Sequence, residues 1–288
     1  MKLLTIKIEP LSAFATLPKG DTIFGQMVFN DFLEGQKNFE NYLLEEPKLI
    51  VSDMLPFGYV YKPTLPLDYF KDKNDVEVDK KDLRKKVFIT IENLQNGSLH
   101  LCENVKYKQD TQVVKNAINR TSFTTGDGDF APYSLIEQTY FKNLWIFILV
   151  DENLEKRAIE LLKKVGKFGF GKKSTIGKGS FNIEVIQTPI KTFETNYYMS
   201  ISPTILENQD LEDIWYEPFT RFGKFGVGKN SENIFKKPVL MANSASIIKT
   251  KKSISYFGKA VNNGTEQKIS FLQGYSIAIP IKLKEKNV

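Results

Sequence analysis

The glycine-lysine loop, residues 167–179, constrains this chain more than any other stretch of its sequence. It reads KFGFGKKSTIGKG, follows an amphipathic helical pattern and precedes a β-branched strand pattern. Its glycines let the backbone adopt φ > 0 and approach a ligand closely, so that main-chain N–H groups can point outward together. The chain is therefore expected to return from a helix to a strand through a tight, cationic turn.

The side chains of the glycine-lysine loop are those of a phosphate-binding turn. Lys172, Lys173 and Lys178 supply positive charge, and Ser174 and Thr175 supply short hydroxyl donors. The loop contains no acidic residue. Composition leaves one alternative open, a solvated surface loop in which a glycine only caps the helix.

The charge of the chain is unevenly distributed. With 288 residues, 41% of them hydrophobic, the chain can bury a substantial core in one large or two medium domains. Lysine and arginine exceed aspartate and glutamate by 40 − 34 = 6, which favours polyanionic partners. Six lysines lie within residues 163–178 without an acid, whereas residues 71–86 mix lysines with acids. We interpret the first segment as a candidate binding surface and the second as a solvated insertion.

The chain has one cysteine, Cys102, and one histidine, His100. These numbers exclude a disulfide and a Cys/His zinc site, and they leave no choice of histidines for a Ser-His-Asp triad. We predict no catalytic set, no metal and no cofactor. The first residues, MKLLTIKIEPL, are too short and too alternating for a signal sequence, and no apolar run approaches a membrane span. The expected location is cytoplasmic, with no membrane partner.

Hydrophobic patterning predicts an α+β fold. We expect strands at residues 2–8, 49–54, 87–91, 99–105, 144–150 and 180–186. We expect helices from Asp21 or Thr22 to Gly35, over residues 39–46, and from Asp151 or Asn153 to Gly166. An Asn96-Gly97 turn is expected to join two of the strands as a hairpin. This order has some likeness to a ferredoxin-like, split βαβ fold.

Two further segments are expected to leave the core. Residues 61–86 read as an exposed excursion, because two prolines are followed by charges without apolar periodicity. Residues 106–133 read as a protruding ribbon. From residue 188 the pattern is mostly β, with strands expected at residues 197–203, 239–248 and 276–281.

Two motifs resemble ligand-binding loops and fail on inspection. Residues 223–230, GKFGVGKN, have phosphate-loop spacing through Lys229, but Asn230 stands where the magnesium-binding Ser or Thr belongs, and the flanking strand and helix are missing. Asp127 and Asp129 in GDGD lack the remaining ligands of a calcium loop, so we expect a turn.

His100 is expected on a strand without an assigned partner, which favours a structural role.

The protruding ribbon is a second candidate RNA-binding feature. Arg120 can bind phosphate in a fork, and Asn116 and Asn119 can contact base or sugar edges. Phe123 and Tyr133 are placed to stack on unpaired bases. An ordinary solvated hairpin is the alternative.

Five motifs together resemble a known family. They are LPKGDTIFGQMVF at 17–29, LIVSDMLPFG at 49–58, NAINRTSFTTGDGDFAPYSL at 116–135, GFGKKSTIGKGSF at 169–181 and FLQGYSIAIPI at 271–281. In order and spacing the chain resembles the RAMP superfamily of CRISPR proteins, and within it the family of subunit four of the type III-A Csm effector complex. Two departures exist. The turn at 242–246, ANSAS, lacks the glycine that often precedes its serine, and no early catalytic histidine is present, so neither an RNA contact by that turn nor nuclease activity is carried over.

The resemblance implies two packed ferredoxin-like domains, residues 1–187 with an insertion at about 61–86 and a hairpin thumb at about 106–133, and residues 188–288. It implies that the 5′ handle of a CRISPR RNA lies across them, next to a large Palm-domain polymerase-like subunit and an adjacent backbone RAMP subunit, with only indirect contact to target RNA. The RNA-binding residues that it implies are Gly169, Gly171, Lys172, Lys173, Ser174, Thr175, Gly177 and Lys178 in the loop, Asn119 and Arg120 in the thumb, and Lys19 and Gly20, with Asp21 bordering the same groove.

The expected function is that of a non-catalytic RNA-binding subunit in antiviral defence. Two alternatives stay open. One is a metal-independent endoribonuclease of the RAMP superfamily that processes CRISPR RNA, in which His100 or Tyr133 acts in acid-base chemistry. The other is a protein-interaction scaffold without direct RNA contact.

Overall fold

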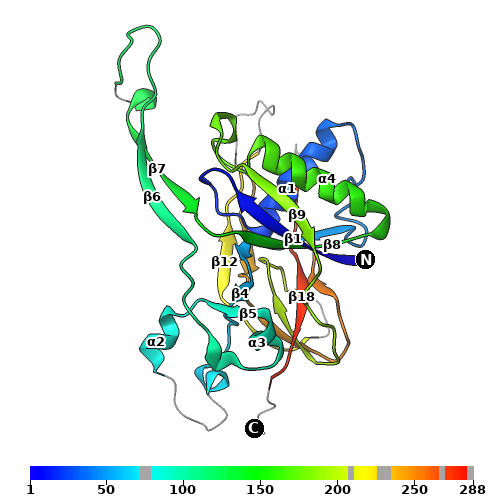
Figure 1. The fold of residues 1–288 in the computed structure, drawn as a ribbon. Helices are drawn as coiled ribbons and strands as arrows, with labels where there is room; N and C mark the ends of the chain where they lie inside the picture. The colour runs from blue at the N-terminus through cyan, green and yellow to red at the C-terminus, as the bar shows by residue number, and fades with distance from the viewer. Residues whose placement is uncertain (72–78, 127, 207–210, 226–234, 266–269, 284–288) are drawn as a thin grey trace.

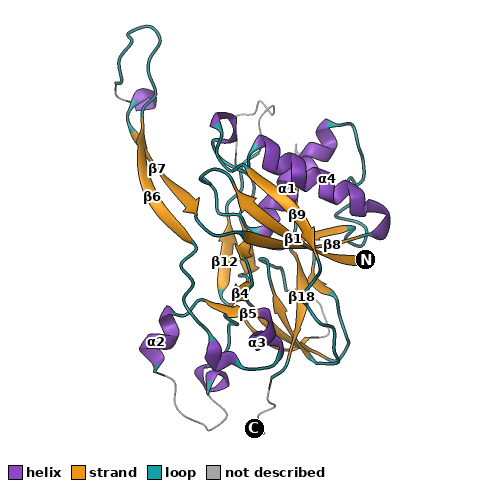
Figure 2. Ribbon diagram, in the orientation of Figure 1, coloured by secondary structure: helices purple, strands orange, loops and turns teal. Residues whose placement is uncertain are grey.

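The computed structural model describes residues 1–71, 79–126, 128–206, 211–225, 235–265 and 270–283. Figures 1 and 2 show an α+β molecule, rich in strands and with few helices, from which one long hairpin projects. The helices are α1 (Gly20–Leu33), α2 (Lys80–Lys85), α3 (Ile91–Gln95) and α4 (Glu155–Phe168).

The first sheet is antiparallel and carries two helices on one face. Its strands are β1 (Lys2–Pro10), β2 (Leu49–Val51), β3 (Leu55–Pro56), β8 (Leu144–Val150) and β9 (Phe181–Ile186). Four of them lie in the order β2-β8-β1-β9, and β3 also pairs with β8. Helix α1 connects β1 to β2, and α4 connects β8 to β9. Ile146 and Ile148 of β8 share a core with both helices, whereas Phe147 faces the second sheet, which explains why the β8 sequence is apolar throughout.

The second sheet repeats the strand order of the first. Its strands are β10 (Tyr197–Ser200), β11 (Leu211–Trp215), β14 (Ile247–Thr250), β15 (Tyr256–Gly258) and β18 (Tyr275–Ile281). They lie in the order β11-β14-β10-β18-β15. When β3 and β15 are left out, the remaining four strands of each sheet, numbered along the chain, lie in the same order, 2-3-1-4. In the described part of the second sheet, no helix joins these strands.

Two-stranded ribbons complete the fold. They are β4 (Tyr59–Tyr61) with β5 (Phe88–Thr90), β6 (Lys108–Lys115) with β7 (Tyr133–Tyr140), β12 (Pro218–Arg221) with β13 (Val239–Ala242), and β16 (Val261–Asn262) with β17 (Phe271–Leu272). The β6–β7 hairpin projects far from the rest of the molecule (Figure 1). This confirms the predicted ribbon, although its return strand continues beyond residue 133 to Tyr140.

Residues 61–86 are not simply an exposed excursion, and that prediction is wrong for part of the segment. Phe70 and Leu83 are buried and belong to the same hydrophobic cluster as Phe147 and Met199. Burying a side chain of this size contributes roughly 1.5–3 kcal/mol, so two of them anchor the insertion. The burial of these two residues could not be predicted from the sequence, because single apolar residues among charged ones show no hydrophobic periodicity.

The predicted hairpin around Asn96-Gly97 is also wrong. Residues 91–95 form α3, and residues 99–101 form a 3₁₀ turn, η2 (Leu99–Leu101), rather than a strand. The Thr90 hydroxyl accepts a hydrogen bond from the Asn93 N–H (3.2 Å) and caps α3, and Gly97 follows the helix with a φ of +73°. The same Asn-Gly pair therefore ends a helix instead of turning a hairpin.

Three other predicted boundaries need correction. Residues 39–46 form successive turns rather than a helix, with Phe39 and Tyr42 packed against Phe24. Helix α4 continues through Gly166, where a Cβ would lie 2.3 Å from the Phe181 carbonyl oxygen, so this glycine permits close packing on β9 instead of ending the helix. The strand predicted at 239–248 is broken into β13 and β14, because Ala245 between them has a φ of +75°.

Other predictions are confirmed, notably β1, β8, β9, β18 and the body of α4. The predicted domain boundary at residue 187 falls between β9 and β10 and stays a prediction. In the described part of the chain, no helix is long and apolar enough to span a membrane.

Candidate nucleic-acid interface

The glycine-lysine loop is held in shape by residues from α1 and from the segment after β1. The Gln26 side chain accepts a hydrogen bond from the Gly171 N–H (3.0 Å) and donates one to the Gly169 carbonyl (2.8 Å). The Lys172 N–H donates to the Thr16 hydroxyl (2.9 Å). Phe170 is fully buried beneath the loop. The loop is therefore pre-formed, which lowers the entropy cost of binding a ligand.

Most main-chain N–H groups of the loop are used internally, so the expected row of outward-pointing donors is largely wrong. The amides of Phe170, Ile176, Gly177, Lys178 and Gly179 donate to backbone carbonyls. The physical reason is that several left-handed residues fold the loop back on itself, Gly177 and Gly179 among them. The amides of Lys173, Ser174 and Thr175, where the 3₁₀ turn η5 (Ser174–Ile176) begins, have no acceptor among the described residues.

The side chains of the loop remain accessible. Lys172 and Thr175 are exposed, and Lys173, Ser174 and Lys178 are half-buried. Lys172 forms no ion pair with a residue that the structure describes. The loop thus offers charge and hydroxyl groups at the surface.

The loop lies against the projecting hairpin. The Lys173 ammonium donates a hydrogen bond to the Tyr133 hydroxyl (2.5 Å) and stands 4.9 Å from the centre of that ring. Tyr133 is the first residue of β7 and is 40% exposed. The two features that the sequence offered as RNA-binding elements are therefore adjacent in space.

A second contact between loop and hairpin brings in an acid that the local sequence did not reveal. Lys178 Nζ lies 2.5 Å from Glu137 Oε2, and Lys115 Nζ lies 2.9 Å from Glu137 Oε1. The hydrogen bonds from Lys178 and then Lys115 hold the pKa of Glu137 below its ordinary value. Lys178 is therefore partly neutralised, in contrast with Lys172.

Asn119 and Arg120 are in a different place from the loop. They belong to the segment that joins β6 to β7, which forms the far end of the hairpin (Figure 1). The Asn119 side-chain oxygen accepts from the Thr121 N–H (2.9 Å), so this amide shapes the turn. Arg120 is exposed, and the neighbouring Phe123 is 83% exposed. Tyr133 and Glu137, rather than Asn119 and Arg120, reach the glycine-lysine loop.

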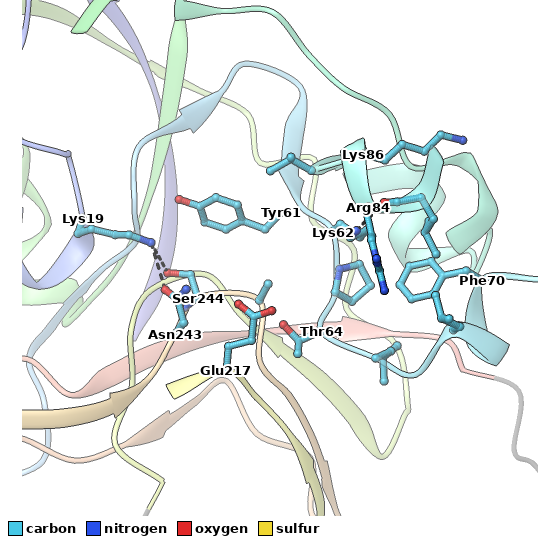
Figure 3. A pocket seen from close by; sticks show the side chains of 16 residues that line it. Lys19, Tyr61, Lys62, Thr64, Phe70, Arg84, Lys86, Glu217, Asn243 and Ser244 are labelled. Atoms are coloured by element: carbon cyan, nitrogen blue, oxygen red, sulfur yellow. Dashed lines mark hydrogen bonds between the residues drawn. The ribbon is translucent and has the colours of Figure 1, made fainter. Parts of the chain in front are cut away.

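Lys19 belongs to a buried polar cluster. Its ammonium lies 2.8 Å from Asp53 Oδ2, 3.1 Å from Ser244 Oγ and 3.4 Å from Asn243 Oδ1 (Figure 3 draws the last two contacts). Asp53 also accepts hydrogen bonds from the Gly20 N–H (2.7 Å), the Tyr61 hydroxyl (3.0 Å) and the Ser244 hydroxyl (2.6 Å). The cluster thus joins the start of α1 to the turn between β13 and β14.

Gly20 serves packing in this cluster. A Cβ at Gly20 would lie 2.2 Å from the Val51 carbonyl oxygen, so no larger residue fits. Sequence reasoning identified Lys19 and Gly20 but missed Asp53, although an aspartate two residues after the apolar strand β2 is a signal for such a site. Asp21, expected at the same groove, is nearly buried and forms two hydrogen bonds with Arg221 of β12 (2.5 and 2.6 Å). Burial raises the pKa of Asp21, while Arg221 acts in the opposite direction.

Other candidate residues form no site in the described structure. No group of three His, Cys, Asp or Glu side chains in the described ranges could hold a metal ion. His100 lies in η2 instead of a strand, and burial raises the pKa of the Cys102 thiol to about 12. Residues 226–230 of the second glycine-rich motif, and Asp127, lie outside the described residues.

Comparisons with known proteins identify the fold. No protein-family model and no curated protein matches the chain. A solved structure of a Csm1–Csm4 cassette with cA4 matches at a TM-score of 0.61 and 13% identity, covering 99% of this chain and 100% of the other. The same cassette with AMPPNP matches at 0.61 and 15%, covering 99% of each chain.

A Csm3–Csm4 subcomplex of the type III-A CRISPR-Cas interference complex matches at a TM-score of 0.58 and 15% identity, covering 93% of this chain and 98% of the other. Csm4 is the component that these complexes share. At such low identity the likeness concerns the fold. The chain has, over its full length, a fold similar to that of Csm4, a RAMP protein of type III CRISPR effectors, which confirms at this level the resemblance stated from its sequence.

Proposed function

We propose that this chain is a non-catalytic, RNA-binding subunit that anchors the 5′ handle of a CRISPR RNA in a type III-A effector. The observation that carries the proposal is the contact between Lys173 and Tyr133, which closes the glycine-lysine loop onto the hairpin. This contact places the cationic loop directly beside the partly exposed Tyr133 ring of the hairpin. A single RNA strand lying along that surface would meet lysines, hydroxyl groups and an aromatic ring.

The chemistry of this surface suits RNA bound mainly through its backbone. Lys172 is exposed, Ser174 and Thr175 carry hydroxyl donors, and the loop geometry is fixed by Gln26 and Thr16. Tyr133 offers a partly exposed ring on which a base can stack. Binding through phosphates should weaken steeply as salt concentration rises.

The repeated strand order supports a two-unit architecture. We propose that β1, β2, β8 and β9 with α1 and α4 form one ferredoxin-like unit, and that β10, β11, β14 and β18 form a second unit without the helices. Both sets of strands follow the order 2-3-1-4. The RNA handle would then cross the junction of two related sheets.

Partners of the chain are proposed from the structural neighbours. The similar chains occur in complexes named for Csm1 with Csm4 and for Csm3 with Csm4. We propose equivalent contacts here, with a large polymerase-like subunit and with an adjacent backbone RAMP subunit, target RNA being reached only indirectly. Exposed apolar residues on the hairpin, Val114 (65%) and Ile136 (61%), support burial of this element against a neighbouring subunit.

A charge-matched pair of variants tests the RNA-binding surface. The chain is purified, its bound RNA is sequenced, and that RNA is resynthesised with a fluorescent label for anisotropy titrations. The double variant Lys172→Ala and Lys173→Ala should weaken binding at least tenfold and reduce the salt slope by about 1.4, for two lost phosphate contacts to a single strand. The control is the double variant Lys156→Ala and Lys191→Ala, which removes the same charge at two exposed lysines outside residues 163–178. Equal affinity of the two double variants would contradict the assigned surface.

The same preparation distinguishes the two alternatives. A RAMP endoribonuclease would cut labelled precursor repeat RNA at one site, and the Tyr133 hydroxyl beside the Lys173 ammonium is the group to test with Tyr133→Phe, next to His100→Ala. A protein-interaction scaffold would carry no RNA and would give no gel shift. An intact RNA that co-purifies and binds in a salt-dependent manner is the result expected for the proposed subunit.

A further inference from the structure

A cavity of about 430 Å³ lies between the insertion and the second sheet, distinct from the glycine-lysine loop. Figure 3 shows its lining, with side chains of the 61–87 segment on one side and of the β13–β14 turn and Glu217 on the other. We call it the insertion pocket. Its polar lining includes Tyr61, Lys62, Thr64, Arg84, Glu217 and Ser244.

The insertion side of the pocket is cationic. The half-buried Lys62 ammonium donates a hydrogen bond to the Leu83 carbonyl (2.8 Å). Burial lowers the pKa of Lys62, whereas Cys102 and Glu217 act in the opposite direction, so a bound anion would further stabilise the charged form. Arg84 is exposed and forms no ion pair with a residue in the described ranges. Lys86 pairs with Asp82 and Lys19 pairs with Asp53, so Lys62 and Arg84 carry the available charge.

The opposite side of the pocket accepts hydrogen bonds. The exposed Glu217 carboxylate faces the cavity, with the hydroxyl groups of Thr64 and Ser244 beside it (Figure 3). Phe70, Leu83 and the Tyr61 ring also line the pocket and supply apolar wall. One end of the pocket thus suits an anion and the other suits a group that presents N–H donors.

The wall of the pocket contains strained backbone. Ala245 is buried and has a φ of +75°, a conformation that favours glycine. Residues other than glycine keep a positive φ mainly where the surrounding structure imposes this conformation. Such positions concentrate at ligand-binding sites. Here the Ala245 N–H donates to the Ser200 carbonyl and its own carbonyl accepts from Thr64, which fixes the turn that carries Ser244.

We propose that the insertion pocket holds one unstacked nucleotide of the bound RNA, with its phosphate at Lys62 and Arg84 and the N–H edge of its base at Glu217. The inference rests on the proposed RNA-binding function and adds a base-reading site to it. The cavity is within the size range of small-ligand pockets. Guanine is the base that presents two adjacent N–H donors to one carboxylate, so we infer a preference for guanosine at one position of the strand.

The test compares a labelled oligouridine with the same RNA carrying a single guanosine at each position in turn. Wild-type chain should bind at least one of the guanosine-containing RNAs about tenfold more tightly than oligouridine, and Glu217→Gln should abolish that preference. Arg84→Ala should weaken all of these RNAs and reduce the salt slope by about 0.7. The matched controls are Asp213→Asn on the exposed side of β11 and Lys85→Ala beside Arg84, neither of which lines the pocket.

The result separates this proposal from the proposed function. Absence of any guanosine preference in the wild type, or a preference that Glu217→Gln leaves intact, would overturn the nucleotide assignment. Weakening by Arg84→Ala no greater than that by Lys85→Ala would do the same. In either case, lost binding in the Lys172→Ala and Lys173→Ala variant would still support RNA binding at the loop. If Arg84→Ala impaired assembly with partner subunits while RNA binding was unchanged, the pocket would be a protein contact.

Discussion

Two lysine-glycine turns of this molecule, both expected to bind RNA, differ in the partners of the lysine beside the glycine. At the start of α1, the Lys19 side chain is 18% exposed and pairs with Asp53, whose side chain is 1% exposed. In the glycine-lysine loop, Lys172 is exposed and Lys173 meets a tyrosine hydroxyl. A lysine beside a glycine thus forms a largely buried ion pair that joins two segments in one turn, and carries a charge at the surface in the other. What decides between the two roles is a third residue, supplied by another segment of the chain.

The two turns also differ in what a loss of charge would do. The Lys19–Asp53 pair is surrounded by Tyr61, Ser244 and the Gly20 amide, so removing one partner leaves several buried polar groups unpaired. Lys172 is exposed, and Lys173 meets the Tyr133 hydroxyl rather than a carboxylate, so removing either lysine alters binding with little effect on folding. The comparison therefore predicts separate effects on stability and on RNA affinity.

The largest effect is expected at Asp53. Asp53→Ala should lower the free energy of unfolding by about 3–5 kcal/mol, because it leaves a partly buried ammonium without its counter-charge. Urea denaturation followed by circular dichroism measures the change, with Asp213→Ala on an exposed strand as the control. A loss below about 1 kcal/mol would mean that the cluster is open to water, and the contrast between the two turns would fail.

The sequence predicted those features that depend on neighbouring residues. The seven apolar residues of β8, the alternation of β18 and the stripe of α4 each indicate one element, and the structure confirms them. The contacts that define the turns join residues far apart: Lys19 and Asp53 are separated by 34 positions, and Lys178 and Glu137 by 41. No local pattern reports such pairs. The error at Asn96-Gly97 has a local cause, because the Thr90 cap favoured a helix that the turn motif concealed.

Replacing glycines of the glycine-lysine loop by alanine is expected to have an intermediate effect on the free energy of unfolding. Gly177 and Gly179 both have positive φ, but a Cβ at Gly179 would lie 2.3 Å from the Phe170 carbonyl oxygen, whereas a Cβ at Gly177 meets nothing within 4 Å. Gly177→Ala should cost only backbone strain, about 1 kcal/mol, and Gly179→Ala about 3 kcal/mol. Thermal unfolding measures both. Equal losses would show that the loop readjusts, so that its lysines are not held in a fixed arrangement.

The smallest effect is expected at Glu137. This carboxylate pairs with the half-buried Lys178, which is therefore intermediate between the largely buried, paired Lys19 and the exposed Lys172. Glu137→Gln removes the carboxylate that binds Lys178 and Lys115, so both ammonium groups become available to RNA phosphates. RNA affinity should rise about threefold, and the salt slope should steepen by about 0.7 for each ammonium group that gains a phosphate contact. Glu184→Gln, which removes an exposed acid from β9, is the matched control.

The pH dependence of stability provides an independent measure of the same pair. The hydrogen bonds from Lys178 and Lys115 lower the pKa of Glu137 in the folded chain below its ordinary value of 4.5. The contribution of this carboxylate to stability, about 1 kcal/mol, is therefore present above pH 4.5 and is lost as pH falls through the lowered pKa. The difference in unfolding free energy between wild type and Glu137→Gln should be greatest near neutral pH and should vanish in acid. A difference that persists unchanged in acid would mean that packing, rather than charge, joins the hairpin to the loop, and Lys178 would then belong with the solvated lysines.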